Sequence, residues 1–267
     1  MEARPGGTER SRVSPSPASS NLFDSDEEDM PIVTEMKMAP TWFTKPVEKL
    51  EVHWRTLEAL TTSRITDSSQ ISDVHRKMLD IADIVIEEEI KLALTDGQIT
   101  PCLEYLLNID AFQSLVECTQ RQQEYGMDLR DAVMKFIMQL LSSSKQPLLM
   151  HSQLLRPLLR LLDSSRMSES KEYSTTVVSL VFQIWYCIER DTSLVALFED
   201  GGGSGQPRPS SGFPLVDLLM DHIHLDGDIG EWTRGAFLAI LRVCSLPAGK
   251  GVEEYLEKSV FCQVRSV

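Results

Sequence analysis

The most constraining feature of this sequence is a leucine-rich stretch from Ile99 to Leu162, in which apolar residues recur at the spacing of helix faces. Thr100 can cap a helix whose first turn contains Pro101. Pro147 and Pro157 each restart the chain within leucine-dense segments. A short helix cannot bury a wide apolar stripe by itself, so each must pack against its neighbours. The stretch therefore predicts a stack of helices.

The rest of the chain repeats this pattern without any strand signal. Stripes follow Pro46, span about residues 71–95 with closure at Gly97, and span about 169–190. Further helices are predicted to begin at Pro214, and at Asp128 and Asp228 as capping residues. Pairs of helices recur about every 35 to 45 residues, which is the repeat length of HEAT and armadillo units, although no consensus repeat is present. We expect an all-α fold, an irregular α-solenoid of armadillo or HEAT type.

Composition shifts predict the domain organisation. Residues 1–40 are rich in Ser, Pro and acidic residues and are expected to form a disordered tail, whereas residues 41–267 form the helical domain with a flexible Gly-rich loop at 200–212. Ser14 and Ser16 precede prolines, and Ser25 lies in an acidic run, so all three are candidate phosphorylation sites.

The overall charge limits the classes of partner. A net charge of −14 argues against duplex nucleic acid and against a broad basic patch for anionic lipid. No apolar run reaches the length of a membrane span, and no secretory signal is evident at the N-terminus. The five cysteines form no C-x-x-C pair and fall mostly in apolar helical patterns, which predicts buried thiols in a reducing, cytoplasmic compartment.

Candidate sites of chemistry are weak. The chain contains no familiar nucleophile, nucleotide-binding or zinc-binding motif, so no catalytic, cofactor-binding or metal-binding residue is predicted. His222 and His224 are too close in sequence to share a helix face, and Asp226–Asp228 lacks the rest of a calcium loop. Glu87–Glu89 point in three directions around a helix, which favours a solvated surface whose exposed members a basic partner could contact. His53 is interpreted as a packing residue.

Two motifs in order carry a family resemblance: PCLEYLLN at residues 101–108 and QPLLMHSQLLRPLLRLL at residues 146–162. With the His-Trp pair, the glutamate run and the later YLEKSVFC, they resemble the N-terminal part of the FHIP family, Hook-interacting proteins also grouped as retinoic-acid-induced-like. The resemblance covers about residues 42–262. The matching motif residues, expected to be structural, are His53, Trp54, Pro101, Cys102, Leu103, Glu104, Tyr105, Leu106, Leu107, Gln146, Pro147, Arg156 and Pro157.

The resemblance implies an adaptor with an α-solenoid fold. Its expected partners are a Hook-type coiled-coil protein, an FTS-like protein and a Rab GTPase as the membrane cue, and the complex links dynein to vesicle or early-endosome cargo. Membrane contact would be indirect, and the expected location is cytoplasmic with vesicle or endosome association. Family members are expected to run well beyond Val267, so the chain is expected to be an N-terminal portion or a short form.

A second hypothesis from another class is a generic armadillo-like scaffold that binds short peptides in an unrelated pathway. Such grooves use ladders of Asn or Trp, and Asn occurs here only at Asn21 and Asn108.

Overall fold

The computed structural model describes residues 44–93, 98–122, 124–164, 171–198, 213–220 and 222–264, all within one compact unit, Ala39–Val267. The described residues contain helices and no strand, which confirms the all-α prediction. The tail with Ser14, Ser16 and Ser25, and the Gly-rich loop, lie outside the described residues. The helices are α1 (Thr44–Thr62), α2 (Ser68–Leu92), α3 (Pro101–Asn108), α4 (Ala111–Arg121), α5 (Gly126–Ser143), η1 (Leu148–Met150), α6 (Ser152–Asp163), α7 (Lys171–Arg190), η2 (Thr192–Leu194), α8 (Val195–Phe198), α9 (Pro214–Met220), α10 (Asp228–Cys244), η4 (Pro247–Gly249) and α11 (Lys250–Val264).

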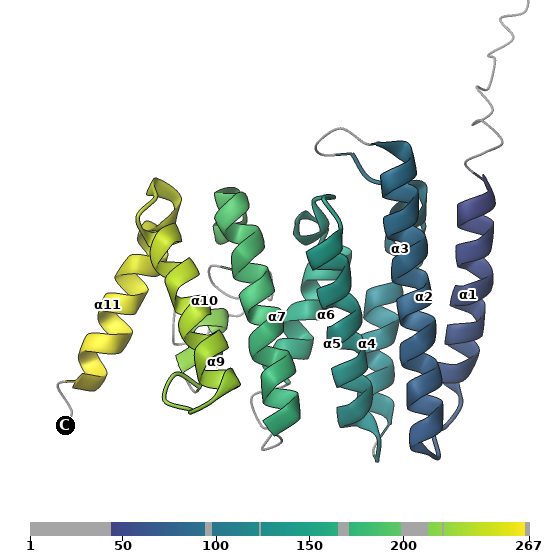
Figure 1. The fold of residues 1–267 in the computed structure, drawn as a ribbon, viewed down its shortest axis with the longest axis horizontal. Helices are drawn as coiled ribbons and strands as arrows, with labels where there is room; N and C mark the ends of the chain where they lie inside the picture. Colours follow the sequence, from purple (N-terminus) through teal and green to yellow (C-terminus); the bar gives the residue numbers. More distant parts are fainter. Residues whose placement is uncertain are drawn as a thin grey trace, which may run out of the picture. The chain divides into compact units, whose positions relative to one another are not determined.

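The longer helices pack side by side in chain order. α1 packs against α2, α2 against α5, α5 against α7 and α7 against α10, so four helices form one row after α1 (Figure 1). α4 contacts both α5 and α6, and α3 contacts α1, α2 and α4. Each long helix therefore has neighbours on both sides, which is how the apolar stripes of the sequence become buried.

The predicted stripes form the core. On α2 the stripe is buried along its length, and on α7 Trp185 lies in the core at 1% exposure. Phe112 of α4 and Phe136 of α5 stack with ring centroids 6.0 Å apart. Burying each such side chain contributes about 1.5–3 kcal/mol relative to leaving it in water. The buried residues of the α2 stripe are Ile71, Val74, Met78, Ile81, Ala82 and Val85.

Helix starts follow local caps in two places. The Thr100 side chain accepts a hydrogen bond from the Leu103 amide at 3.1 Å, which confirms the predicted cap of α3. The Asp67 carboxylate accepts from the Gln70 amide at 3.0 Å, so α2 begins three residues before its apolar stripe. α2 ends at Leu92, and the next residue, Ala93, adopts a left-handed conformation with φ 44°. The predicted closure at Gly97 lies outside the described residues.

The predictions of Asp128 and Asp228 as caps were wrong. α5 begins at Gly126, where a Cβ would lie 2.8 Å from the Thr119 carbonyl oxygen, so the close approach of α4 places the helix start. Asp128 then lies in the first turn of α5, where its negative charge interacts favourably with the positive end of the helix dipole. Asp228 is the first residue of α10, and Gly227 precedes it with φ 77°.

One of the two prolines in the leucine-rich stretch also differs from the prediction. Pro147 immediately precedes the short helix η1, as a restart requires. Pro157 does not begin a helix; it lies inside α6, where its ring nitrogen cannot donate a backbone hydrogen bond. The strong apolar face of α6, packed against α4, offsets this missing bond.

Among the described residues, no single helix is long and apolar enough to cross a membrane. α10 and the segment Pro247–Glu257 reach that length and composition together, but a bend of 113° separates them.

Candidate functional site

Five residues from three separated segments form a buried polar cluster, which we call the polar junction: Glu88, Glu89, Thr100, Cys102 and Gln146. The segments are the last turns of α2, the start of α3 and the loop between α5 and η1. All three contain the motifs that carry the family resemblance. The motifs therefore meet in space although they lie apart in the sequence.

The Glu88 carboxylate lies at the start of α3. Its side chain is 3% exposed, and Oε2 accepts a hydrogen bond from the Cys102 amide at 2.8 Å. The position suits a negative charge because the first amides of a helix are unpaired and the helix dipole is positive there. Burial raises the pKa of the Cys102 thiol, and the hydrogen bond and charge of Glu88 raise that pKa further.

The Glu89 carboxylate holds the loop after α5. It accepts hydrogen bonds from the Ser144 hydroxyl at 2.6 Å, from the Lys145 amide at 2.7 Å and from the Gln146 side-chain amide at 3.0 Å. Three donors on one carboxylate make a stronger anchor than neutral hydrogen bonds would. The loop is therefore attached to α2 at one point.

The Gln146 side chain joins the two halves of the junction. Its Oε1 accepts a hydrogen bond from the Thr100 amide at 2.7 Å, and its Nε2 donates to Glu89. Both Thr100 and Gln146 are buried, so these bonds form where water cannot replace them. One side chain thus ties α3, α2 and the α5–η1 loop together.

The interpretation of Glu87–Glu89 as a solvated helix face with two exposed members was wrong for Glu88, which is buried, and only partly right for Glu89, which is half-buried. Glu87 is exposed and accepts from Lys91 at 3.2 Å, whereas a basic partner has no access to Glu88. No local pattern distinguishes these glutamates, because their hydrogen-bond partners lie in later segments of the chain. The glutamate run is a structural element rather than a charged surface.

The remaining motif residues fill the core or cover it. Trp54 is buried, and His53 lies with Nδ1 3.5 Å from the Asp80 carboxylate, which also accepts from Lys77 at 3.0 Å. The apolar residues of the α3 motif, Leu103, Leu106 and Leu107, are buried together with Pro157. Tyr105, Pro101 and Pro147 are half-buried, and Glu104 and Arg156 are exposed.

The described residues offer little reactive chemistry. They contain no group of three or more His, Cys, Asp or Glu side chains placed to hold a metal ion. Burial raises the pKa of the Cys102, Cys118, Cys187 and Cys244 thiols. A thiol with a raised pKa stays protonated near neutral pH and is a poor nucleophile.

A different kind of surface occurs on α10. We call it the outer apolar surface, and its members are Leu238 and Leu241, exposed by 59% and 56%. They share one face of α10, opposite its buried side. Tyr186 of α7 and Trp232 of α10 are also exposed, by 48% and 46%, but Trp232 lies on the side of α10 that packs against α7. Neighbouring exposed apolar residues are typical of interaction sites.

Contacts between α7 and α10 fix this surface. The Trp232 ring packs edge-on against Phe182 of α7, with centroids 5.6 Å apart. Arg242 of α10 donates to Glu189 of α7 at 3.2 Å. The two helices also form the most extensive helix pair in the described residues, so the surface is rigid.

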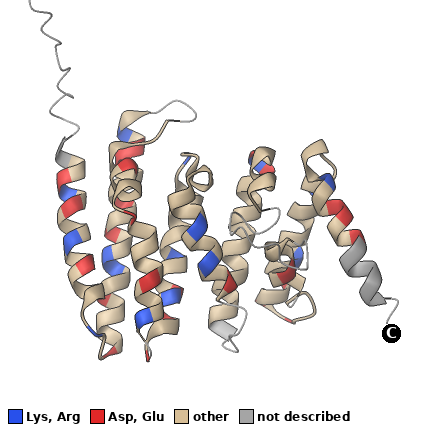
Figure 2. Cartoon of the chain, turned by 180° about the vertical axis from the view of Figure 1, so that it is seen from behind, with Lys and Arg blue, Asp and Glu red and all other residues tan. Residues whose placement is uncertain are grey.

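The outer faces of α2 and α5 are polar by comparison. Gln139 of α5 donates to Asp83 of α2 at 2.9 Å, and Lys135 pairs with Asp131 at 2.6 Å. Seen from behind, α1 carries blue and red residues along most of its length (Figure 2). A sequence signal for the outer apolar surface exists, because Leu238 and Leu241 are three residues apart and so share one face of a helix.

Comparison with known proteins gives a consistent family assignment. The family described as Retinoic acid induced 16-like protein matches residues 102–266. The chain is 31% identical over 144 residues to an FHIP family protein of Culex quinquefasciatus, a match covering 52% of this chain and 14% of that protein. It is 26% identical over 181 residues to the FHF complex subunit HOOK-interacting protein 1A of Homo sapiens, covering 68% of this chain and 16% of the human protein.

A third relative extends the match over more of the chain. An FHIP family protein of Nematostella vectensis is 24% identical over 224 residues, which covers 82% of this chain and 24% of that protein. The chain thus spans less than a quarter of the length of these relatives.

Proposed function

We propose that this chain, which belongs to the RAI16-like family and matches FHIP family proteins, is a non-catalytic adaptor that binds a Hook-type coiled-coil protein. The observation that carries the proposal is the outer apolar surface on α10, in a chain that is similar to a HOOK-interacting protein. An adaptor requires a rigid body with an exposed recognition surface and needs no reactive group.

The proposed contact is between helices. A coiled-coil protein presents amphipathic helices, and such a helix can lay its apolar face across a neighbouring apolar surface. Leu238 and Leu241 would be the anchors of this contact. The Arg242–Glu189 ion pair would form part of the polar rim.

A wider cellular role can be proposed from the family resemblance. We propose that the chain contributes to a complex that includes an FTS-like protein and links dynein, through Hook, to vesicle or endosome cargo, with a Rab GTPase as the membrane cue. A cytoplasmic location associated with vesicles or endosomes belongs to this proposal. The side-by-side packing of α2, α5, α7 and α10 supports an α-solenoid arrangement, which suits a scaffold.

The chemistry of the described residues supports a role without catalysis. The titratable groups of the polar junction are engaged in hydrogen bonds that hold helices together, and the thiols are buried with raised pKa values. A functional site for proton or group transfer would instead bring several perturbed titratable groups to one accessible cleft.

The test is a binding measurement between the purified chain and a purified Hook-type coiled-coil protein, with FTS-like and Rab proteins in separate arms. We expect binding in the Hook arm, and we expect the double variant Leu238→Lys, Leu241→Lys to weaken it at least about tenfold, because anchor residues dominate interface energies. The matched control is Ile90→Lys, which places a lysine at another exposed apolar position, on α2.

Binding that is lost equally in the Ile90→Lys control, or retained in the double variant, would reject the outer apolar surface as the contact. Failure of the unaltered chain to bind any Hook-type protein would reject the adaptor function proposed for this chain.

A further inference from the structure

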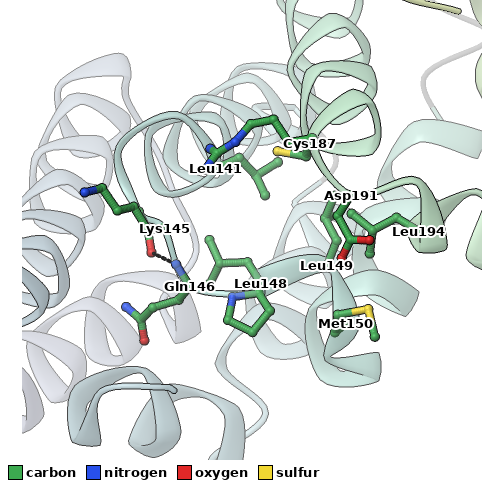
Figure 3. A pocket seen from close by; sticks show the side chains of 12 residues that line it. Leu141, Lys145, Gln146, Leu148, Leu149, Met150, Cys187, Asp191 and Leu194 are labelled. Carbon is green, nitrogen blue, oxygen red and sulfur yellow. Dashed lines mark hydrogen bonds between the residues drawn. The ribbon is translucent and has the colours of Figure 1, made fainter. Parts of the chain in front are cut away.

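A groove separate from the outer apolar surface lies between the α5–η1 loop and the C-terminal end of α7. It has a volume of about 400 Å³ and is open on one side. Figure 3 shows Lys145 and Gln146 along one side, with Asp191, Leu194 and Met150 at the opposite end. No part of the proposed Hook contact lines this groove.

The lining of the groove combines buried leucines with polar residues. Leu141, Leu148, Leu149 and Leu194 line it and are each at most 5% exposed, whereas the Met150 side chain at the edge is 53% exposed. The volume lies within the range of ligand-binding pockets.

Two cations distinguish this groove from the rest of a chain whose net charge is −14. Lys145 and Arg190 both line it, both are exposed, and the side chain of neither forms an ion pair within the described part of the chain. The charge of Arg190 acts on the Cys187 thiol, another lining residue, which places the guanidinium close to the groove.

One carboxylate, Asp191, also lines the groove. It accepts hydrogen bonds from the Ser193 amide at 3.1 Å and from the Ser193 hydroxyl at 2.7 Å, at the start of η2. Glu89 is occupied by its three donors in the α5–η1 loop. The lining therefore carries two cations, Lys145 and Arg190, against one carboxylate.

The groove is held open by internal bonds. The Glu89 anchor and the Gln146–Thr100 hydrogen bond fix the loop wall, and Gln183 of α7 donates to the Leu141 carbonyl oxygen at 3.4 Å across the two helices. A wall that is already ordered binds a ligand without a further loss of loop entropy.

We propose that this groove binds a short acidic segment of a partner protein. An apolar side chain of that segment would enter between Leu148, Leu149 and Leu194, and flanking carboxylates would pair with Lys145 and Arg190. An acidic peptide fits both observations at once, because it combines apolar side chains with carboxylates that complement the excess of two cations over one carboxylate in the lining. The site is independent of the proposed Hook contact.

The test uses a fluorescein-labelled synthetic peptide with a central Leu-Phe pair flanked by glutamates, titrated with the purified chain and followed by fluorescence anisotropy. Two control peptides replace the glutamates with lysines, or the Leu-Phe pair with serines. We expect the first peptide to bind, and both controls to bind at least about tenfold more weakly.

Charge reversal locates the binding. The double variant Lys145→Glu, Arg190→Glu is expected to weaken binding at least about tenfold, since it removes two charge pairs with the peptide and adds repulsion. The matched control Arg64→Glu changes an exposed arginine outside the groove and should leave binding unchanged. Met150→Glu, at the exposed edge, should weaken binding by placing a carboxylate beside the acidic peptide.

Circular dichroism of each variant checks that the helices are retained. No binding of the glutamate peptide to the unaltered chain would overturn the proposal, as would equal binding of the lysine peptide. Binding that survives both the double reversal and Met150→Glu would also overturn it. A failure of Hook binding has no bearing on these outcomes, so the two proposals fail separately.

Discussion

The polar junction and the outer apolar surface use side chains in opposite ways. At the junction, charged and polar residues such as Glu88 and Gln146 are buried and hydrogen-bonded to backbone groups of other segments. On α10, the large apolar residues Leu238 and Leu241 face outward. The charged motif therefore maintains the fold, whereas the apolar residues are the ones available to partners.

Residue type alone therefore does not locate function in a stack of helices. A buried carboxylate needs a hydrogen-bond donor, and the donor to Glu88 is the Cys102 amide of another helix, which the stack brings close. An exposed leucine costs little until a partner covers it. The contrast can be tested by changing each region and measuring stability and surface exposure separately.

The largest expected effect is at Glu88. Glu88→Ala removes the acceptor of the buried Cys102 amide, so the unfolding free energy should fall by about 3 kcal/mol. Urea denaturation followed by circular dichroism measures this change. The matched control Glu87→Ala loses only the exposed pair with Lys91 and should cost about 0.5 kcal/mol or less. Equal effects of the two variants would mean that the junction does not stabilise the fold.

A smaller loss is expected at Gln146. Gln146→Ala removes the bonds to Thr100 and Glu89, and the unfolding free energy should fall by about 2 kcal/mol because the Thr100 amide remains buried. The same urea measurement applies, with Gln153→Ala as an exposed control. A change below about 0.5 kcal/mol would show that water replaces these bonds and that the junction is open.

Substitutions on the outer apolar surface should leave the unfolding free energy nearly unchanged, in contrast to those at the polar junction. The double variant Leu238→Ser, Leu241→Ser should change the unfolding free energy by only about 0.5 kcal/mol, since both side chains are more than half exposed. Binding of a hydrophobic dye to the folded chain should decrease. A destabilisation of about 2 kcal/mol or more would indicate that these leucines support packing and are not a free surface.

The smallest expected effect is a pH dependence within α2. Burial lowers the pKa of His75 below its usual 6.5, Lys135 lowers that pKa further, and Asp131 opposes the shift. The unfolded chain therefore takes up this proton at a higher pH than the folded chain. The stabilising contribution of neutral His75 is complete above the ordinary pKa and declines as the pH falls through it.

Comparing urea midpoints at about pH 7.5 and about pH 5.5 measures this dependence. His75→Gln should make the decline shallower than in the unaltered chain. An identical or steeper decline in the variant would show that His75 is not the group responsible.

Several features of this fold could be predicted from local sequence because their causes are local. The Thr100 cap of α3 depends on an amide three residues away, and the α2 stripe depends on the helical repeat alone. The start of α5 could not be predicted from Asp128, because the deciding contact is the approach of Gly126 to Thr119 of another helix. The family assignment was also available from the sequence, since the motifs occur in order along the chain.

The helices, the apolar stripes and the membership of the RAI16-like family could be read from the chain alone, because helical periodicity and ordered motifs are properties of neighbouring residues. The packing of the helices was needed to show that Glu88 is buried, that Leu238 and Leu241 lie outside, and that Lys145 and Arg190 border one groove. The physical reason is that burial depends on which helix covers a given face, and the covering helix lies tens of residues away in the chain.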